Sequence, residues 1–289
     1  MYIFTNMTLL TNFLFKFKLT DILNNVMMKK HAPHPEFDVP MLAEDGECRY
    51  LHFDSPWAQG AMSLSEPNSL VFEYTKQMCA WLLFQEATNN KAMALLGLGA
   101  GSHFRFLQHY TQATISCVEW SELVIMCAQD HFHVEETERC QIVQSNAETW
   151  VHDVDVQGQY DVLMVDLYDY TAEGPVCSSK KFYKGCANVL GKSGIATFNL
   201  FGHHPSFAKN LTNIRAAFDN RVIMFPETED GNRIVIAFKG PVLERSVGEL
   251  KARAKQVEAD YALPAPKFLE VLLKEQANQH IVQMDKVII

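Results

Sequence analysis

The sequence predicts an α/β fold in which a doubly wound, mostly parallel sheet of seven strands follows a small N-terminal β piece. The first observation behind this is the apolar run Ala94–Leu96, which has the character of a buried parallel strand. Gly97, Gly99 and Gly101 follow it directly and let the backbone turn sharply beside a ligand. The second is that strand-like and helical segments alternate after these glycines, as in parallel sheets covered by helices on both faces.

Residues 1–42 are expected to be an extension and linker outside this fold. Residues 13–19 are apolar but interrupted by two lysines, so they are too short and too polar to cross a bilayer. They also lack the unbroken apolar core and cleavage site of a signal peptide. Met27 and Met28 are alternative starts, and three prolines in residues 31–40 indicate a linker. We expect this extension to be flexible.

A small β domain is expected over residues 43–75. Residues 49–53 and 60–64 have the character of short strands, joined through residues 54–59. Apolar residues then recur at helical spacing over residues 70–84. This helix leads into the glycine stretch.

Residues 76–240 form the predicted main domain. After the strand at Ala94–Leu96, its expected strands are 114–119, 140–143, 160–166, 194–201, 221–225 and 233–238. The helices expected between them are 103–110, 121–131, 147–151 and 180–190. Only a short turn separates the last two strands, so we expect an antiparallel hairpin at one edge of the sheet.

Residues 241–289 are expected to form a helical tail. An amphipathic stripe is formed by Leu243, Val247, Leu250, Val257 and Tyr261. Two prolines then interrupt the pattern before a second helix. Such a tail is suited to packing or to contact with another copy of the chain, rather than to chemistry.

The composition argues against nucleic acid as a partner. Of the 289 residues, 48% are hydrophobic and 20% are charged, which is ordinary for a globular protein. The formal net charge is −9, and no run of lysine and arginine could follow a phosphate backbone. We therefore expect neither a nucleic-acid nor a membrane partner, and an acidic protein suits a cationic small substrate.

The cysteines and histidines indicate neither a disulfide framework nor a metal site. The cysteine count is odd and includes no Cys-x-x-Cys pair, so we expect reduced core thiols in a cytoplasmic protein; the cysteines are Cys48, Cys79, Cys117, Cys127, Cys140, Cys177 and Cys186. The pairs His131/His133 and His203/His204 lack a carboxylate or cysteine at ligand spacing. No metal ligands are therefore expected.

Several predicted strand ends carry side chains suited to a nucleoside. In such a sheet, ligands bind outside the carboxyl ends of the strands. Glu119 ends the second strand, where a carboxylate can accept both hydroxyls of a ribose. Asn146 and Ala147 follow the third strand, in a position suited to an adenine edge, and Asp166 and Asp169 follow the fourth. One such acid is often only a helix cap, but this set in this order favours a binding site.

The glycine spacing favours an adenosyl-sulfonium nucleoside over a dinucleotide. Dinucleotide-binding sheets usually carry Gly-x-Gly-x-x-Gly, whereas Gly97, Gly99 and Gly101 alternate. Most methyltransferases that use S-adenosylmethionine (AdoMet) also carry an acid two residues before the first glycine. This chain has Leu95 there.

The arrangement resembles the spermidine synthase (polyamine aminopropyltransferase) family over about residues 50–240. Three stretches carry the resemblance: residues 96–101, the pair Val118-Glu119, and residues 160–169 with Gly174-Pro175, similar to the family's Tyr-Asp-x-Ile-x-x-Asp-x-x-Asp and Gly-Pro. Gln59 and Tyr74 are similar to the gating glutamine and tyrosine near the family's amino-terminal β domain.

The resemblance implies a Rossmann-like, class I methyltransferase-like domain and an SN2 transfer. An aminopropyl group would pass from decarboxylated AdoMet, a co-substrate rather than a permanently bound cofactor, to an amine such as putrescine. Asp166 would be proton acceptor and electrostatic anchor, Asp169 would hold the amine, Tyr74 would assist, and Gln59 would orient the substrate. The nucleoside would be bound by Gly97, Gly99, Gly101, Glu119, Asn146 and Ala147.

Three positions depart from the family pattern. Ala100 stands for the aspartate of the glycine motif, Thr75-Lys76 for a His-Glu pair, and Asn146 for the aspartate usual after the third strand. Two alternatives stay open: a methyltransferase that uses intact AdoMet, and a non-catalytic nucleoside-binding homologue. Because members of the family are often dimers or tetramers, we expect a homo-oligomer such as a dimer.

Overall fold

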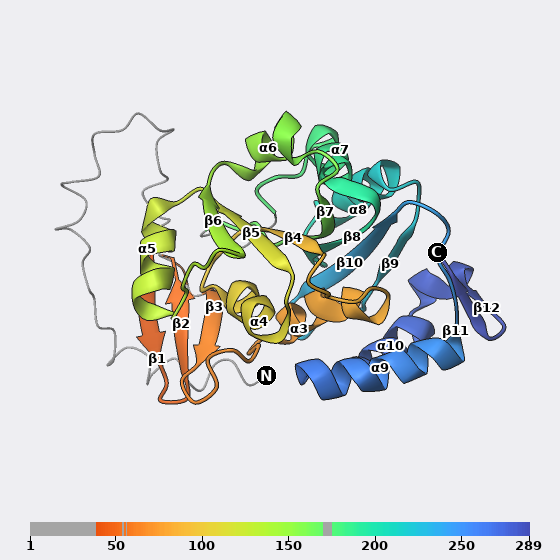
Figure 1. The fold of residues 1–289 in the computed structure, drawn as a ribbon, viewed down its shortest axis with the longest axis horizontal. Coiled ribbons are helices and arrows are strands. Elements are labelled where there is room, and N and C mark those ends of the chain that lie inside the picture. Colours follow the sequence, from red (N-terminus) through yellow and green to blue (C-terminus); the bar gives the residue numbers. More distant parts are fainter. Residues whose placement is uncertain (1–38, 54, 56, 170–174) are drawn as a thin grey trace.

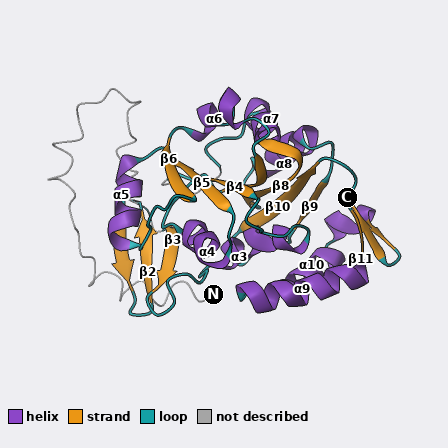
Figure 2. Cartoon of the chain, viewed as in Figure 1, coloured by secondary structure: helices purple, strands orange, loops and turns teal. Residues whose placement is uncertain are grey.

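The computed structural model describes residues 39–53, 55, 57–169 and 175–289. The expectation for residues 1–38, and Gly174 of the Gly-Pro pair, lie outside this part of the chain. Within it, a central sheet runs through the molecule with helices on both faces (Figure 1 and Figure 2). A small sheet packs at the N-terminal side, and two helices with a second small sheet pack at the C-terminal side (Figure 1).

The central sheet has seven strands in the order β6-β5-β4-β7-β8-β10-β9. Their bounds are β4 (Ala92–Leu96), β5 (Thr114–Glu119), β6 (Cys140–Gln144), β7 (Tyr160–Val165), β8 (Leu190–Phe201), β9 (Val222–Met224) and β10 (Asn232–Lys239). The five neighbouring strands β6, β5, β4, β7 and β8 are parallel to one another. Strand β10 pairs antiparallel with both β8 and β9. The predicted mostly parallel, seven-stranded sheet with an antiparallel edge is confirmed. The strand order reverses between β4 and β7, which is where such sheets bind ligands.

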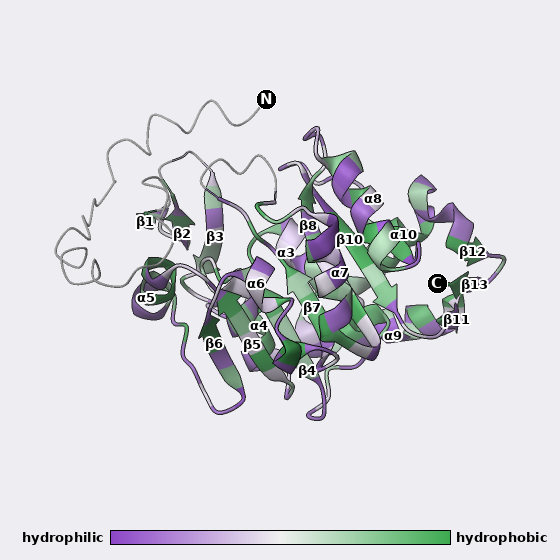
Figure 3. Ribbon diagram, turned by 90° about the horizontal axis from the view of Figure 1, so that it is seen from above, coloured by the Kyte–Doolittle hydropathy of each residue, from purple (hydrophilic) through white to green (hydrophobic). Residues whose placement is uncertain are grey.

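Alternate residues of the strands feed two separate cores. In β4, Met93 and Leu95 belong to the core on one face, and Ala94 and Leu96 to the core on the other. The first core is covered by α3 (Glu73–Met78), α4 (Ser102–Tyr110), α9 (Val247–Tyr261) and α10 (Ala265–Lys274). The second is covered by α6 (Ala147–Trp150), α7 (Lys180–Val189) and α8 (Phe207–Ala217). Hydrophobic residues accordingly dominate β7 and β10 (Figure 3).

The N-terminal sheet is a three-stranded antiparallel meander of β1 (Met41–Glu44), β2 (Cys48–His52) and β3 (Ala58–Ser63). Leu51 and Met62 pack from it against Ala100, and against Cys127 of α5 (Glu122–His131). This contact joins the small sheet to the glycine turn. Strand β1 was not predicted from the sequence. Ala43 is its one fully buried residue, so β1 lacks the alternation of apolar and polar residues that marks a half-buried strand.

Two helix predictions differ from the structure. The helix predicted over residues 70–84 is α3 followed by a 3₁₀ segment, η1 (Cys79–Leu83). All five residues of η1 are buried. The apolar residues of this segment therefore reflect burial on all sides, and not the single apolar face of an amphipathic helix. Helix α8 was not predicted; its polar residues Asn210 and Asn213 are buried, which weakens its amphipathic pattern. The short η2 (Val154–Val156) was also unexpected.

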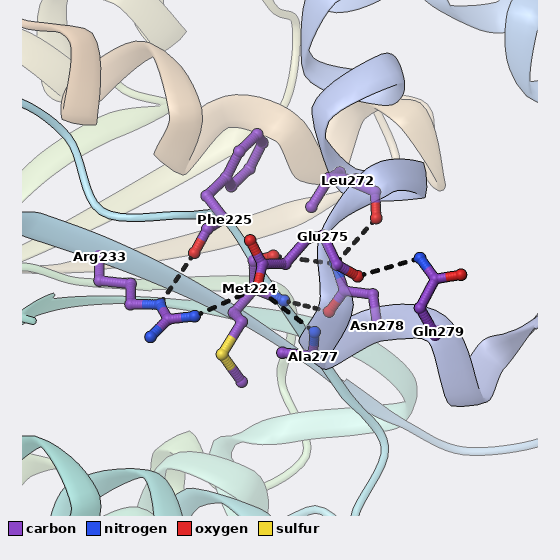
Figure 4. Close-up of polar contacts among 8 residues, drawn as sticks. All are labelled: Met224, Phe225, Arg233, Leu272, Glu275, Ala277, Asn278 and Gln279. Carbon is purple, nitrogen blue, oxygen red and sulfur yellow. Dashed lines mark hydrogen bonds and ion pairs between the residues drawn. The ribbon is translucent and has the colours of Figure 1, made fainter.

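The C-terminal tail packs on the central sheet, with α9 and α10 on one face and the segment after α10 beside the edge strand β9. After α10 follow η3 (Gln276–Ile281) and a sheet of β11 (Glu244–Ser246), β12 (Val282–Gln283) and β13 (Lys286–Ile288). The side chain of Asn278 accepts from Met224 N and donates to the carbonyls of Met224 and Leu272 (Figure 4). Arg233 of β10 reaches Glu275 in the same region. No helix of the described ranges is long and apolar enough to cross a membrane.

Candidate active site

A cavity of about 520 Å³ opens at the carboxyl ends of β4, β5 and β7, between the central sheet and the N-terminal sheet. The predicted site residues that line it are Gln59, Tyr74, Gly97, Gly99, Glu119, Asn146, Ala147, Asp166 and Asp169. Gly101 does not line it. The fold therefore gathers residues from six separate segments of the chain into one place.

The glycine turn brings β4 and β7 into close backbone contact. Gly97 has φ +97°, and a Cβ there would lie 2.1 Å from the carbonyl oxygen of Asp166. Gly101 has φ +71° and is the N-cap of α4; a Cβ there would lie 2.2 Å from the side chain of Val134. Only glycine fits either position without displacing a neighbour. Gly101 thus shapes the turn, whereas Gly97 and Gly99 face the cavity.

Glu119 is a buried carboxylate in the cavity wall, with 7% of its surface exposed. Its Oε2 accepts from Leu98 N at 3.0 Å, and its Oε1 accepts from Ser121 N at 2.9 Å. These two bonds fix the carboxylate between the glycine turn and the start of α5. A carboxylate oxygen can accept more than one hydrogen bond, so this residue type in this place is suited to ribose hydroxyls.

Asn146 has a structural task beside the cavity. Its Oδ1 accepts from Glu148 N at 2.9 Å and Thr149 N at 3.3 Å, which makes it the N-cap of α6. With the oxygen used in this way, its amide NH₂ is the part that can donate to a ligand. Ala147 lines the cavity next to it.

Asp166 stands at the centre of a polar network. Its Oδ1 accepts from Asn199 Nδ2 at 2.9 Å, and the hydroxyl of Tyr74 donates to its carboxylate. Burial raises the pKa of Asp166, although nearby His103 and the two hydrogen bonds oppose that shift. Burial, together with the charge of Asp166, raises the pKa of Tyr74 well above its usual range. Tyr74 is therefore a hydrogen-bond donor in this site.

A hydrogen bond links Gln59 and Asp169 in the cavity wall. The Gln59 side chain on β3 donates from Nε2 to the backbone oxygen of Asp169 at 3.0 Å. Residues 110 positions apart in the sequence are thereby joined. The side chains of Gln59 and Asp169 both belong to the cavity wall.

Several polar residues of this site were not predicted from the sequence. Asn199 connects Asp166 to Asn232, whose Nδ2 donates to Asn199 Oδ1 at 3.0 Å. His103, in the first turn of α4, and Asp230 also line the cavity. Asn199 is a buried polar residue of β8, and a polar residue in a strand predicted to be buried is a signal that was available. His103 followed the glycine motif directly, but nothing in its spacing distinguished it from a helix residue.

The charge of the cavity is strongly one-sided. Five carboxylates line it: Glu119, Glu148, Asp166, Asp169 and Asp230. Among the described lining residues there is no lysine or arginine, and His103 is the one basic group. The described part of the chain contains no cluster of three or more histidine, cysteine, aspartate or glutamate residues that could hold a metal ion. Such a cavity attracts a cationic organic ligand.

The sequence matches the model of a known protein family. The spermine/spermidine synthase domain matches residues 71–227, which is more than half of the chain. The lining residues outside this match are those of residues 53–60, together with Asp230 and Asn232.

Among curated proteins, the chain is similar to a polyamine aminopropyltransferase of Neisseria meningitidis. The two are 28% identical over 239 residues, covering 82% of this chain and 90% of the relative. A polyamine aminopropyltransferase of Chromobacterium violaceum is 29% identical over 250 residues, covering 85% and 91%.

Solved structures share the fold. The crystal structure of a probable spermidine synthase from Corynebacterium glutamicum aligns with a TM-score of 0.62 at 16% identity, covering 84% of this chain and 95% of that one. Human methyltransferase-like protein 13, solved with SAH, aligns with a TM-score of 0.59 at 20% identity over 66% and 93%. At these identities the likeness concerns architecture alone.

Proposed function

The chain belongs to the spermine/spermidine synthase family, and on that basis we propose that it transfers an aminopropyl group from decarboxylated AdoMet to a small polyamine such as putrescine. The observation that carries this proposal is the anionic cavity beside the glycine turn. Both substrates are cations, and the described wall offers five carboxylates and no lysine or arginine. Its volume of about 520 Å³ is within the usual range for a small-molecule site.

The nucleoside would lie over the glycine turn. Gly97 and Gly99 allow close approach, and Glu119 would accept the two ribose hydroxyls while its backbone bonds hold it in place. The amide NH₂ of Asn146 would donate to the adenine, next to Ala147. Decarboxylated AdoMet would thus be a co-substrate that leaves as methylthioadenosine.

The amine would lie on the Asp166 side of the cavity. Its nitrogen lone pair forms the new N–C bond, the C–S bond breaks, and the electron pair moves to sulfur, which becomes a neutral thioether. The sulfonium is already a good leaving group, so the protein mainly orients the two reactants. Asp166 would anchor the reacting nitrogen, Tyr74 would assist, Asp169 would hold the amine, and Gln59 would orient it.

The test is product analysis by mass spectrometry. The protein is incubated with putrescine, cadaverine or spermidine, each together with decarboxylated AdoMet or intact AdoMet. The proposal expects an amine lengthened by one aminopropyl unit and an equal amount of methylthioadenosine. If decarboxylated AdoMet gives no product with any amine, the proposal is wrong.

A methyltransferase is the second candidate, and Ala100 is the observation that favours it. The aspartate that the family pattern carries there would repel the carboxylate of intact AdoMet, and alanine has no such charge. Methylated amine and S-adenosylhomocysteine would appear in the arms with intact AdoMet. The same experiment therefore separates the two reactions.

We also propose a cytoplasmic homo-oligomer, with a dimer as the simplest form. All seven cysteines have free thiols, which is consistent with a reducing compartment. Light scattering after size exclusion would give the mass in solution. A mass near 32.9 kDa, that of one chain, would contradict the oligomer.

A further inference from the structure

His103 is the one imidazole in the cavity wall, and it lies beside the group that anchors the amine. It belongs to the first turn of α4, directly after the glycine turn. Asp166 and Tyr74 line the same cavity, and Asp166 is the charged group that acts on the His103 ring. The inference below rests on the proposed function.

One hydrogen bond defines which ring nitrogen carries the proton. His103 Nε2 lies 3.1 Å from the carbonyl oxygen of Thr75 on α3. A carbonyl oxygen can only accept, so Nε2 must be the protonated nitrogen. In the neutral ring, Nδ1 is then the nitrogen with an available lone pair.

The surroundings keep the ring neutral before the amine arrives. Burial lowers the pKa of His103, and the carboxylate of Asp166 and the bond to Thr75 oppose this without reversing it. Of the other groups in the cavity wall, Tyr74 is held protonated by its raised pKa, and Glu119, Asp169 and Asp230 add negative charge. An uncharged base beside carboxylates is suited to receive a proton, because the resulting imidazolium gains ionic partners.

We propose that His103 is a further catalytic residue, the acceptor of the proton that the attacking ammonium loses. The ammonium gives one proton to Nδ1, and its freed lone pair forms the N–C bond as the C–S bond breaks. Asp166 then stabilises the imidazolium, and the proton passes to solvent when the products leave. This moves proton acceptance from Asp166, where the sequence analysis put it, to the neighbouring ring.

The ordinary acid strengths favour the same assignment. A free alkylammonium has a pKa of about 10.4, an imidazole about 6.5 and an aspartic acid about 3.9. Imidazole is therefore ordinarily the nearer of the two to the amine, and the lowered pKa of His103 and the raised pKa of Asp166 narrow this difference within the cavity. Asp166 in addition already accepts hydrogen bonds from Asn199 and Tyr74, which favour its charged form and oppose the rise in pKa that burial causes.

The variant His103→Gln tests this role with little change of shape. A glutamine amide can still donate to the Thr75 carbonyl but has no basic nitrogen. We expect turnover to fall at least a hundredfold, as for loss of a positioned base. The dissociation constant of methylthioadenosine should stay within about threefold. His109→Gln, on the exposed end of the same helix, is the matched control and should leave turnover unchanged.

Two further measurements separate catalysis from structure. Imidazole added to His103→Ala should restore part of the lost turnover, and the fall in native turnover at low pH should be absent in His103→Gln. Turnover of His103→Gln within threefold of the native protein, or no rescue of His103→Ala by imidazole, would overturn the inference.

Nitrogen NMR of the histidine rings distinguishes this inference from the proposed function. The expected result is a neutral His103 with the proton on Nε2, which shifts towards imidazolium when putrescine and methylthioadenosine are added together. A proton on Nδ1 would contradict the inference. If the native protein makes no product with any amine, the proposed function fails, and the NMR result alone decides whether His103 accepts a proton from a bound amine.

Discussion

Glu119 and Asp166 end the two strands that flank β4, yet they are held by different kinds of partner. Glu119 accepts two backbone N–H groups, which cannot move without moving the glycine turn or α5. Asp166 is held by the side chains of Asn199 and Tyr74, which can adjust when a ligand enters. A fixed carboxylate suits binding of a constant nucleoside, and an adjustable one suits a group whose charge changes during the reaction.

Glu119→Ala should weaken methylthioadenosine binding at least tenfold. Loss of a carboxylate that accepts two hydroxyls costs on the order of 2–4 kcal/mol, because hydrogen bonds to charged groups are worth about 1.5–3 kcal/mol each and do not add fully. Calorimetry gives the dissociation constant. Glu122→Ala, an exposed glutamate on α5, is the control. Equal affinities for the two variants would rule out a ribose contact at Glu119.

Asp166→Asn should separate chemistry from binding. The amide keeps the shape and can still accept from Asn199, but it has no charge to stabilise an ammonium or an imidazolium. We expect turnover at least a hundredfold lower and methylthioadenosine affinity within about twofold of native. Asp155→Asn, on the exposed surface, controls for the change of charge. If affinity falls in parallel with turnover, Asp166 binds the nucleoside and its assignment to chemistry is wrong.

Ala100→Asp should shift preference towards decarboxylated AdoMet by up to about a hundredfold, or roughly 1–3 kcal/mol. The new carboxylate would attract the terminal ammonium of that nucleoside and repel the carboxylate of intact AdoMet. The position is tight: Ala100 is 1% exposed, and its Cβ lies 2.6 Å from where a Gly60 Cβ would be.

Ala100→Asn is therefore the matched control for the added size. The dissociation constants of both nucleosides are compared in the native protein and in the two variants. A thousandfold exclusion of AdoMet by the native protein would mean that another group already does the work of the missing aspartate.

At the scale of elements, strands could be predicted from the sequence better than helices. The bounds of β5 agree with the prediction, because its residues alternate between two buried environments and a polar residue ends it. The tail sheet of β11, β12 and β13 could not be predicted, since strands of two or three residues carry too little pattern. They form only where η3 and α9 bring their ends together.

The residues of the candidate site also differ in how well they could be predicted from the sequence. Residues placed by strand ends, such as Glu119 and Asp166, could be predicted because the carboxyl ends of parallel strands meet at one edge. The contact between Asn199 and Asn232 could not, since these residues meet through the antiparallel pairing of β8 with β10, and a sequence does not reveal that register. Gln59 and Tyr74 were found through a family resemblance and not through spacing.

Asn278→Ala should lower the free energy of unfolding by about 2–4 kcal/mol. The side chain is fully buried and makes three hydrogen bonds that join η3 to β9 and α10 (Figure 4). Its loss leaves buried backbone groups without partners, at about 1–3 kcal/mol each. Urea unfolding measures the change. Gln279→Ala also removes bonds to backbone carbonyls, but at an exposed site, so a loss of less than about 0.5 kcal/mol is expected.

At the scale of the whole molecule, the cavity exists only because two sheets meet. The N-terminal sheet supplies Gln59, and the central sheet supplies the strand ends opposite it. Ser102 at the start of α4 donates to the carbonyl of Ala61 on β3 at 2.9 Å, so the glycine turn is tied to both sheets. The buried polar groups between them are consequently coupled to global folding as well as to the reaction.

His103 makes this coupling measurable as a dependence of stability on pH. Its folded pKa is lowered from 6.5, so between the folded pKa and 6.5 the unfolded chain binds more protons than the folded one. Stability contributed by this group therefore rises with pH through that window, by at most about 1.36 kcal/mol per pH unit for one proton. In His103→Gln the imidazole is absent, so this rise of stability with pH is lost. The pKa of Asp166 should also be higher in the variant, because His103 is one of the influences that lower it, and a higher carboxyl pKa makes stability fall as pH rises.

Urea unfolding between pH 5 and pH 7.5 should give a steeper rise for the native protein than for His103→Gln. The pKa of His52 is also lowered, but this residue is present in both proteins and cancels in the difference. Parallel curves would show that the His103 ring is not held neutral in the folded protein, and the proton acceptor proposed for the reaction would lose its physical basis.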